Sequence, residues 1–158
     1  MTAPAVLQAP GWAELRRLSA EGLPVRLEGL EAMDPGTAAE LLAFFLHDPA
    51  ALGPLEPFAA LLTAMVAKRE VSLWDLLPGE PQEEIREAFL RALPREQPPC
   101  MVCACFPVCQ GYAAYAGGCA TWLVLLPTLA AAARELARLR TQHSNPSTAR
   151  GPHVQPPS

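Results

Sequence analysis

The sequence predicts an all-α protein, a small bundle of about five to six helices with a proline-bounded cysteine-rich loop and a disordered C-terminal tail. Apolar residues recur at helical spacing along most of the chain, and prolines and capping residues separate the periodic segments. Alternation at strand spacing is nearly absent. A chain of 158 residues is long enough to bury one core, so one domain is expected.

The predicted helical domain covers residues 11–141, between a flexible N-terminus (1–10) and a disordered tail (142–158). The tail is rich in proline and has no apolar periodicity, which is typical of disorder. The N-terminus has no basic segment followed by an apolar one, so no signal peptide is predicted and a cytoplasmic location is expected.

The first expected helix is Trp12–Ala20, which places apolar residues on one side and two arginines on the other. Leu23–Leu30 alternates briefly and could form one short strand. Thr37 and Glu40 have the spacing of a capping box, which predicts that a second helix begins there. His47 stands near its expected end, just before an Asp-Pro pair.

Prolines and one serine mark the next helices. Pro57 is expected in the first turn of a helix that closes near Arg69. Ser72 resembles an N-cap. A further helix is expected to start with Pro81 at its first position and to close at Pro94.

The loop 98–111 carries four of the five cysteines, and these are the candidate metal ligands: Cys100, Cys103, Cys105 and Cys109. Thiols this close in sequence can converge on one centre at a small entropic cost. The fifth, Cys119, is interpreted as a packing residue. Because no export signal is predicted and the cysteine count is odd, disulfides are not expected.

Several centres suit clustered thiolates. An iron–sulfur cluster is favoured, because four neighbouring cysteines are its usual ligands. Copper(I) also prefers soft thiolates, whereas structural zinc usually draws on two separated pairs of ligands. The predicted function is therefore a thiolate-bound metal or iron–sulfur site with an accessory, electron-transfer or sensing role. Inert buried thiols and lipid attachment are the other interpretations of these cysteines, and no catalytic residue is assigned.

The run Cys-Met-Val-Cys-Ala-Cys-Phe-Pro, from Cys100 to Pro107, resembles the Cys-x-x-Cys-Ser-Cys metal loop of nitrile hydratase α subunits. In that family three thiolates and two backbone amides hold cobalt(III) or low-spin iron(III). The resemblance implies that Cys100, Cys103 and Cys105 are the thiolates, with the last two as sites of oxidation. Ala104 stands where the family has serine. A nitrile-hydratase-like metalloenzyme is therefore a third hypothesis.

An apolar helical segment, residues 112–141, follows the loop. Its first part, Tyr112–Ala133, is long enough to span a bilayer and is followed by arginines. Gly117 and Pro127 interrupt it, so a buried helix pair in the core is the favoured interpretation. The alternative is a membrane-associated interaction protein anchored through 112–133.

Charge is unevenly distributed along the chain. Residues 1–96 are acidic, residues 97–158 are weakly basic, and the formal net charge is −4. No basic face interleaved with aromatic residues is visible, so nucleic-acid binding is not expected. The expected partner is another protein or a second copy of the chain, with membrane association as an open alternative.

Overall fold

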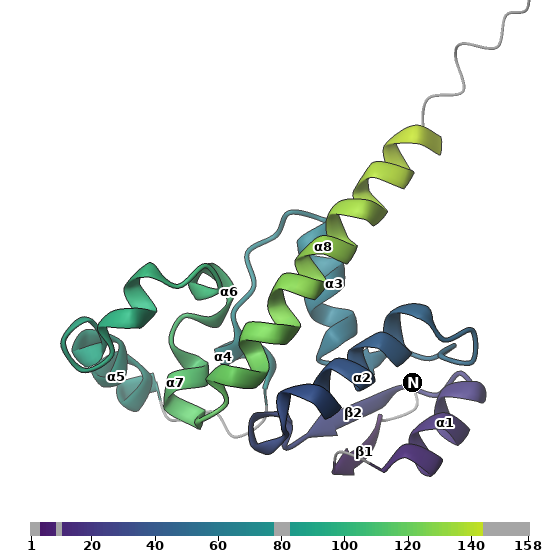
Figure 1. The fold of residues 1–158 in the computed structure, drawn as a ribbon, viewed down its shortest axis with the longest axis horizontal. Coiled ribbons are helices and arrows are strands. Elements are labelled where there is room, and N and C mark those ends of the chain that lie inside the picture. Colours follow the sequence, from purple (N-terminus) through teal and green to yellow (C-terminus); the bar gives the residue numbers. More distant parts are fainter. Residues whose placement is uncertain (1–3, 9–10, 78–82, 144–158) are drawn as a thin grey trace, which may run out of the picture.

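The structure is a computed structural model that describes residues 4–8, 11–77 and 83–143. Within these residues the chain forms eight α-helices, two 3-10 helices and three short strands (Figure 1). In chain order these elements are β1 (Ala5–Gln8), α1 (Trp12–Ala20), β2 (Val25–Glu28), η1 (Leu30–Ala32), α2 (Pro35–His47), β3 (Leu55–Glu56), α3 (Phe58–Val66), α4 (Leu73–Leu76), α5 (Glu83–Glu96), η2 (Pro98–Val102), α6 (Phe106–Cys109), α7 (Tyr112–Ala116) and α8 (Cys119–His143).

A small parallel sheet corrects the predicted all-α class. Its strand order is β1-β2-β3, and Val25 pairs with Ala5 on one side and with Leu55 on the other. The mainly helical character is confirmed, and β2 lies inside the stretch whose alternation suggested a strand. The other two strands were missed because strands of two to four residues are too short for alternation to stand out.

The ends of the predicted domain also differ from expectation. Residues 5–8, assigned to a flexible N-terminus, form β1, and residues 142–143, assigned to the tail, belong to α8. The predictions for residues 1–3, 9–10 and 144–158 lie outside the described residues. The same holds for Pro81 as the first residue of a helix.

Two helix ends differ from the prediction, the first in its capping residue and the second in its position. The N-cap of α2 is Asp34, whose carboxylate accepts a hydrogen bond from the Thr37 backbone N–H at 2.9 Å, with Pro35 at the first helical position. The capping box at Thr37 and Glu40 is therefore wrong. Helix α5 continues through Pro94 to Glu96, so this proline lies in the last turns rather than beyond them.

The core is organised around α8. This helix packs against α2 and α3 and buries one face, which consists of Thr121, Trp122, Leu125, Leu126, Leu129 and Ala133. Figure 1 shows the strands and α1 on one side of its N-terminal half, and α5, α6 and α7 on the other. The segment 112–141 forms two helices, α7 and α8, which separate at Gly117 and Gly118 as expected. The interruption expected at Pro127 is wrong, because α8 continues through that proline. The N-terminal end of α8 consequently faces the cysteine-rich segment.

Candidate functional site

The cysteine-rich segment is wound into two tight turns rather than an open loop. Cys100 lies in η2, Cys103 ends it, Cys105 precedes α6 and Cys109 is the last residue of α6. The backbone N–H of Cys103 donates to the carbonyl of Cys100 at 3.2 Å, and that of Cys109 donates to the carbonyl of Cys105 at 2.8 Å. Prolines at the first positions of both turns favour this winding. The turns bring all four predicted ligands to the same side of the segment.

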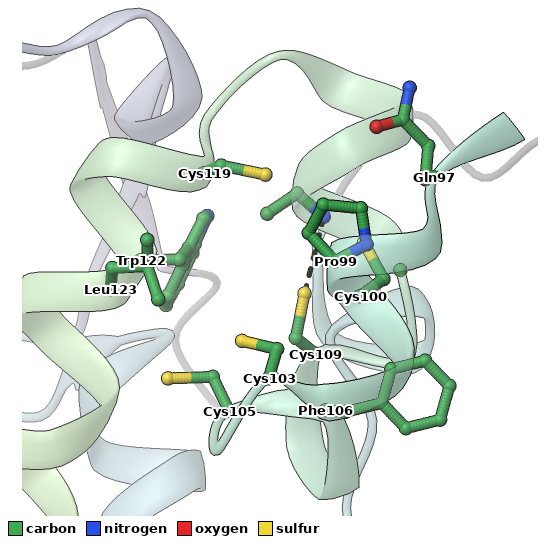
Figure 2. Close-up of a pocket in the computed structure, with 12 residues that line it drawn as sticks. Gln97, Pro99, Cys100, Cys103, Cys105, Phe106, Cys109, Cys119, Trp122 and Leu123 are labelled. Atoms are coloured by element: carbon green, nitrogen blue, oxygen red, sulfur yellow. Dashed lines mark hydrogen bonds between the residues drawn. The ribbon is translucent and has the colours of Figure 1, made fainter. Parts of the chain in front are cut away.

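These four cysteines line one pocket of about 190 Å³, and Cys119 at the start of α8 lines it too. Figure 2 shows Cys119 across the pocket from Cys103 and Cys105. The remaining lining residues are uncharged and mostly apolar: Gln97, Pro99, Phe106, Gly111, Ala113, Trp122 and Leu123. Among the described residues, the pocket therefore gathers all five thiols of the chain and no charged side chain.

The thiols differ in exposure. Cys105 and Cys109 are buried, Cys100 and Cys103 are half-buried, and Cys119 is exposed. All five are free thiols. Cys119 is thus a pocket residue, whereas the sequence suggested a packing role. The sequence carried one usable signal, since Cys119 follows a glycine pair and lies in the same uncharged stretch as the other four.

The thiols are gathered but not drawn together around one point. In the part of the chain that the structure describes, no group of three or more His, Cys, Asp or Glu side chains is arranged to hold a metal ion. A zinc ion needs each sulfur about 2.3 Å away. A mononuclear site would therefore require the pocket thiols to move closer than they lie here.

Burial favours the protonated form of four of the thiols. It raises the pKa of Cys105 to about 11, and the neighbouring Cys103 raises it further. Burial likewise raises the pKa values of the Cys100, Cys109 and Cys119 thiols. At neutral pH these four thiols are therefore uncharged, and a metal that binds them as thiolates must displace their protons.

One thiol already accepts a hydrogen bond that favours a thiolate. The backbone N–H of Ala113 donates to Cys109 Sγ at 3.4 Å, drawn as the dashed line in Figure 2. This contact lowers the pKa of Cys109, against the larger opposite effect of burial. The first turn of α7 therefore contributes a fixed donor to the sulfur-lined wall.

Trp122 of α8 lines the side of the pocket opposite the cysteine-rich segment, and its indole N–H has no acceptor. Its side chain is 1% exposed, and its Nε1 is a buried side-chain nitrogen with no hydrogen-bond partner. By contrast, Trp74 Nε1 donates to the Gln110 carbonyl at 2.9 Å. An unpaired buried donor costs about 1–3 kcal/mol. The sequence does not reveal this unpaired donor, because the missing partner depends on tertiary packing.

Close contacts hold both walls in place. Thr121 Oγ1 donates to the Met33 carbonyl at 2.7 Å, which fixes the first turn of α8 on η1. On the other side Gly111 has a φ of +80°, and a Cβ there would lie 2.9 Å from Leu93 Cδ2 on α5. The pocket is therefore set between two segments that are each anchored to the fold.

No protein-family model matches the sequence, and no curated protein or solved structure is significantly similar to it. The resemblance to the nitrile hydratase metal loop thus rests on its eight residues alone. Among the described helices, α8 is long and apolar enough to cross a membrane. Core helices of soluble proteins meet the same criterion, so this finding is weak evidence for a membrane span.

Proposed function

We propose that the pocket binds a metal–sulfur centre through cysteine thiolates, with an iron–sulfur cluster as the favoured occupant. The observation that carries the proposal is the gathering of five thiols from separate segments around one uncharged pocket. The proposed ligands are Cys100, Cys103, Cys105 and Cys109. The function that follows is accessory, in electron transfer or sensing, because the described lining offers no acid–base pair for catalysis.

The spread of the thiols supports a polynuclear centre over a single ion. The pocket volume, about 190 Å³, exceeds the space that one ion needs, and no three ligand side chains are arranged around a common point. Four cysteines are shared among the irons of a cluster, one on each iron of a [4Fe–4S] centre and two on each iron of a [2Fe–2S] centre. The ligands of a cluster can therefore lie further apart than those of one tetrahedral ion.

The surroundings of the pocket also suit such a centre. Apolar walls limit the access of water, and solvent exposure and hydrogen bonds to sulfur set the reduction potential of a cluster. Two of the proposed ligands, Cys105 and Cys109, are buried, which would keep the centre out of bulk solvent. Copper, zinc and cobalt are the other metals that these thiolates could hold, and metal analysis separates them.

Anaerobic reconstitution with iron(II) and sulfide tests the proposal. We expect a brown protein with a visible charge-transfer band and stoichiometric iron and sulfide. The double variant Cys103→Ser/Cys105→Ser should bind iron at least about tenfold more weakly, because losing even the hydrogen-bond partner of a metal ligand typically costs about 10–100-fold in affinity. Cys119→Ser is the matched control, since it removes a pocket thiol outside the proposed ligand set and should keep its iron.

Two results would contradict the proposal in different ways. A colourless protein without stoichiometric iron, cobalt, copper or zinc would exclude a metal centre. Loss of iron from Cys119→Ser, with retention in the double variant, would show that the ligand set is wrong.

A further inference from the structure

The α8 wall of the pocket carries a donor for which the fold supplies no acceptor. Buried N–H groups are nearly always paired, and the fold pairs the other deeply buried indole, that of Trp74, with a backbone carbonyl. Trp122 Nε1 has no such partner. Figure 2 shows its ring edge-on along the pocket wall, with the nitrogen at the end nearest Cys119. The missing acceptor is therefore expected from an occupant of the pocket.

The other polar features of the pocket indicate the charge of that occupant. The Ala113 N–H points to the sulfur of Cys109. Helix α8, which has 25 residues, begins at the pocket with Cys119, and the N-terminal end of a helix favours negative charge. The described lining has no cationic side chain. The pocket thus provides N–H dipoles without a fixed positive charge, which suits an anionic centre rich in sulfur.

We infer that Trp122 donates its indole N–H to a sulfur of the bound centre, either an inorganic sulfide or a coordinating thiolate. This inference rests on the proposed function. Trp122 is then a tuning and positioning residue, because it contacts the centre without ligating iron. A hydrogen bond to sulfur stabilises the reduced centre, which carries one more negative charge, more than the oxidised one. The donor therefore raises the reduction potential.

The test compares Trp122→Phe with Trp12→Phe after anaerobic loading with iron and sulfide. Phenylalanine keeps an aromatic ring and lacks the donor. Trp12 serves as the control because it lies in α1, against Phe44 and away from the pocket lining. We expect Trp12→Phe to contain as much iron as the wild type, and the potentials are compared per bound centre. In Trp122→Phe, the equilibrium constant for one-electron reduction by dithionite should fall about tenfold, which is about 59 mV. Trp12→Phe should match the wild type.

A second readout can contradict the inference from the wild-type protein alone. In wild-type protein loaded with iron and sulfide, exchange into D₂O under conditions that open the buried sites should shift the iron–sulfur stretching bands in resonance Raman spectra. In Trp122→Phe the shift should be smaller. Absence of any deuterium effect in the wild type overturns the inference even if the variant does not fold.

The possible outcomes distinguish a failure of the role inferred for Trp122 from a failure of the proposed metal–sulfur site. Stoichiometric iron in both proteins, with an unchanged potential and an unchanged deuterium shift in Trp122→Phe, overturns the role of Trp122 and leaves the metal–sulfur site intact. A wild-type protein that takes up no iron overturns both.

Discussion

Burial raises the pKa of four pocket thiols, and at Cys109 a hydrogen bond opposes that effect. Apolar surroundings favour the neutral form, so the pKa of Cys105 rises to about 11. The backbone N–H of Ala113 favours the thiolate of Cys109. A soft metal ion suits these thiols because it replaces their protons and neutralises the charge of the thiolates without water. The metal-free pocket is accordingly stable as long as its thiols keep their protons.

The unfolding free energy of the metal-free protein should therefore fall in alkaline solution. The pKa of the Cys105 thiol rises from 9.0 in the unfolded chain to about 11 in the folded protein, so its contribution is fully present below about pH 9. As the pH rises towards 11, the unfolded state loses its proton first, and stability falls by at most about 1.4 kcal/mol per pH unit for this thiol. Urea unfolding between pH 8 and pH 10 measures the slope.

Cys105→Ala provides the control for this slope. The variant starts from a lower stability because it loses a buried side chain, but its stability should fall less steeply with pH. Parallel slopes in the two proteins would mean that Cys105 does not contribute to the pH dependence.

At the scale of elements, left-handed turns separate the short helices around the pocket. Gln110 and Gly111, with φ of 48° and 80°, lie between α6 and α7, and Gly117, with φ of 86°, lies between α7 and α8. Glycine adopts such angles without steric cost. These reversals let Cys109 of α6 and Cys119 of α8 line one pocket, with α7 between them.

Two of these glycines form a matched pair for mutation. A Cβ at Gly117 would meet nothing within 4 Å, whereas one at Gly111 would lie 2.9 Å from Leu93 Cδ2. Gly117→Ala should cost only the left-handed strain, about 1–2 kcal/mol. Gly111→Ala should cost about 1–3 kcal/mol more, because the buried Leu93 side chain must shift to make room. Urea unfolding of both variants checks this, and equal losses would show that α5 yields freely at Leu93.

At the scale of the whole molecule, the sequence predicted those features that depend on neighbouring residues. The helix Trp12–Ala20 and the N-cap Ser72 were predicted correctly, since local periodicity and capping determine them. The parallel sheet was missed, because it pairs Val25 with residues about 20–30 positions away. The thiols adjacent in sequence were singled out, but the approach of Cys119 and the unpaired indole of Trp122 depend on where α8 packs.

The position of α8 also bears on the membrane alternative. One face of α8 is buried against α2 and α3, and the apolar side chains on that face are part of the core. A membrane-spanning α8 would have to leave this core. Leu125 is fully buried in the core, while its neighbour Val124 is 38% exposed. Only the core interpretation gives these two residues different surroundings.

Placing a carboxylate at either position distinguishes the two interpretations. If α8 is a core helix, Leu125→Asp should lose about 4 kcal/mol or more, because it removes a packed side chain and buries an unpaired charge. Val124→Asp should then change stability by no more than about 0.5 kcal/mol, as exposed sites usually do. If α8 spans a bilayer, both carboxylates face the same hydrocarbon or bundle interior and both should impair insertion. Urea unfolding together with carbonate extraction of cell membranes decides between them. A wild-type protein that stays in the carbonate-washed membranes, with both variants released, would overturn the core role of α8.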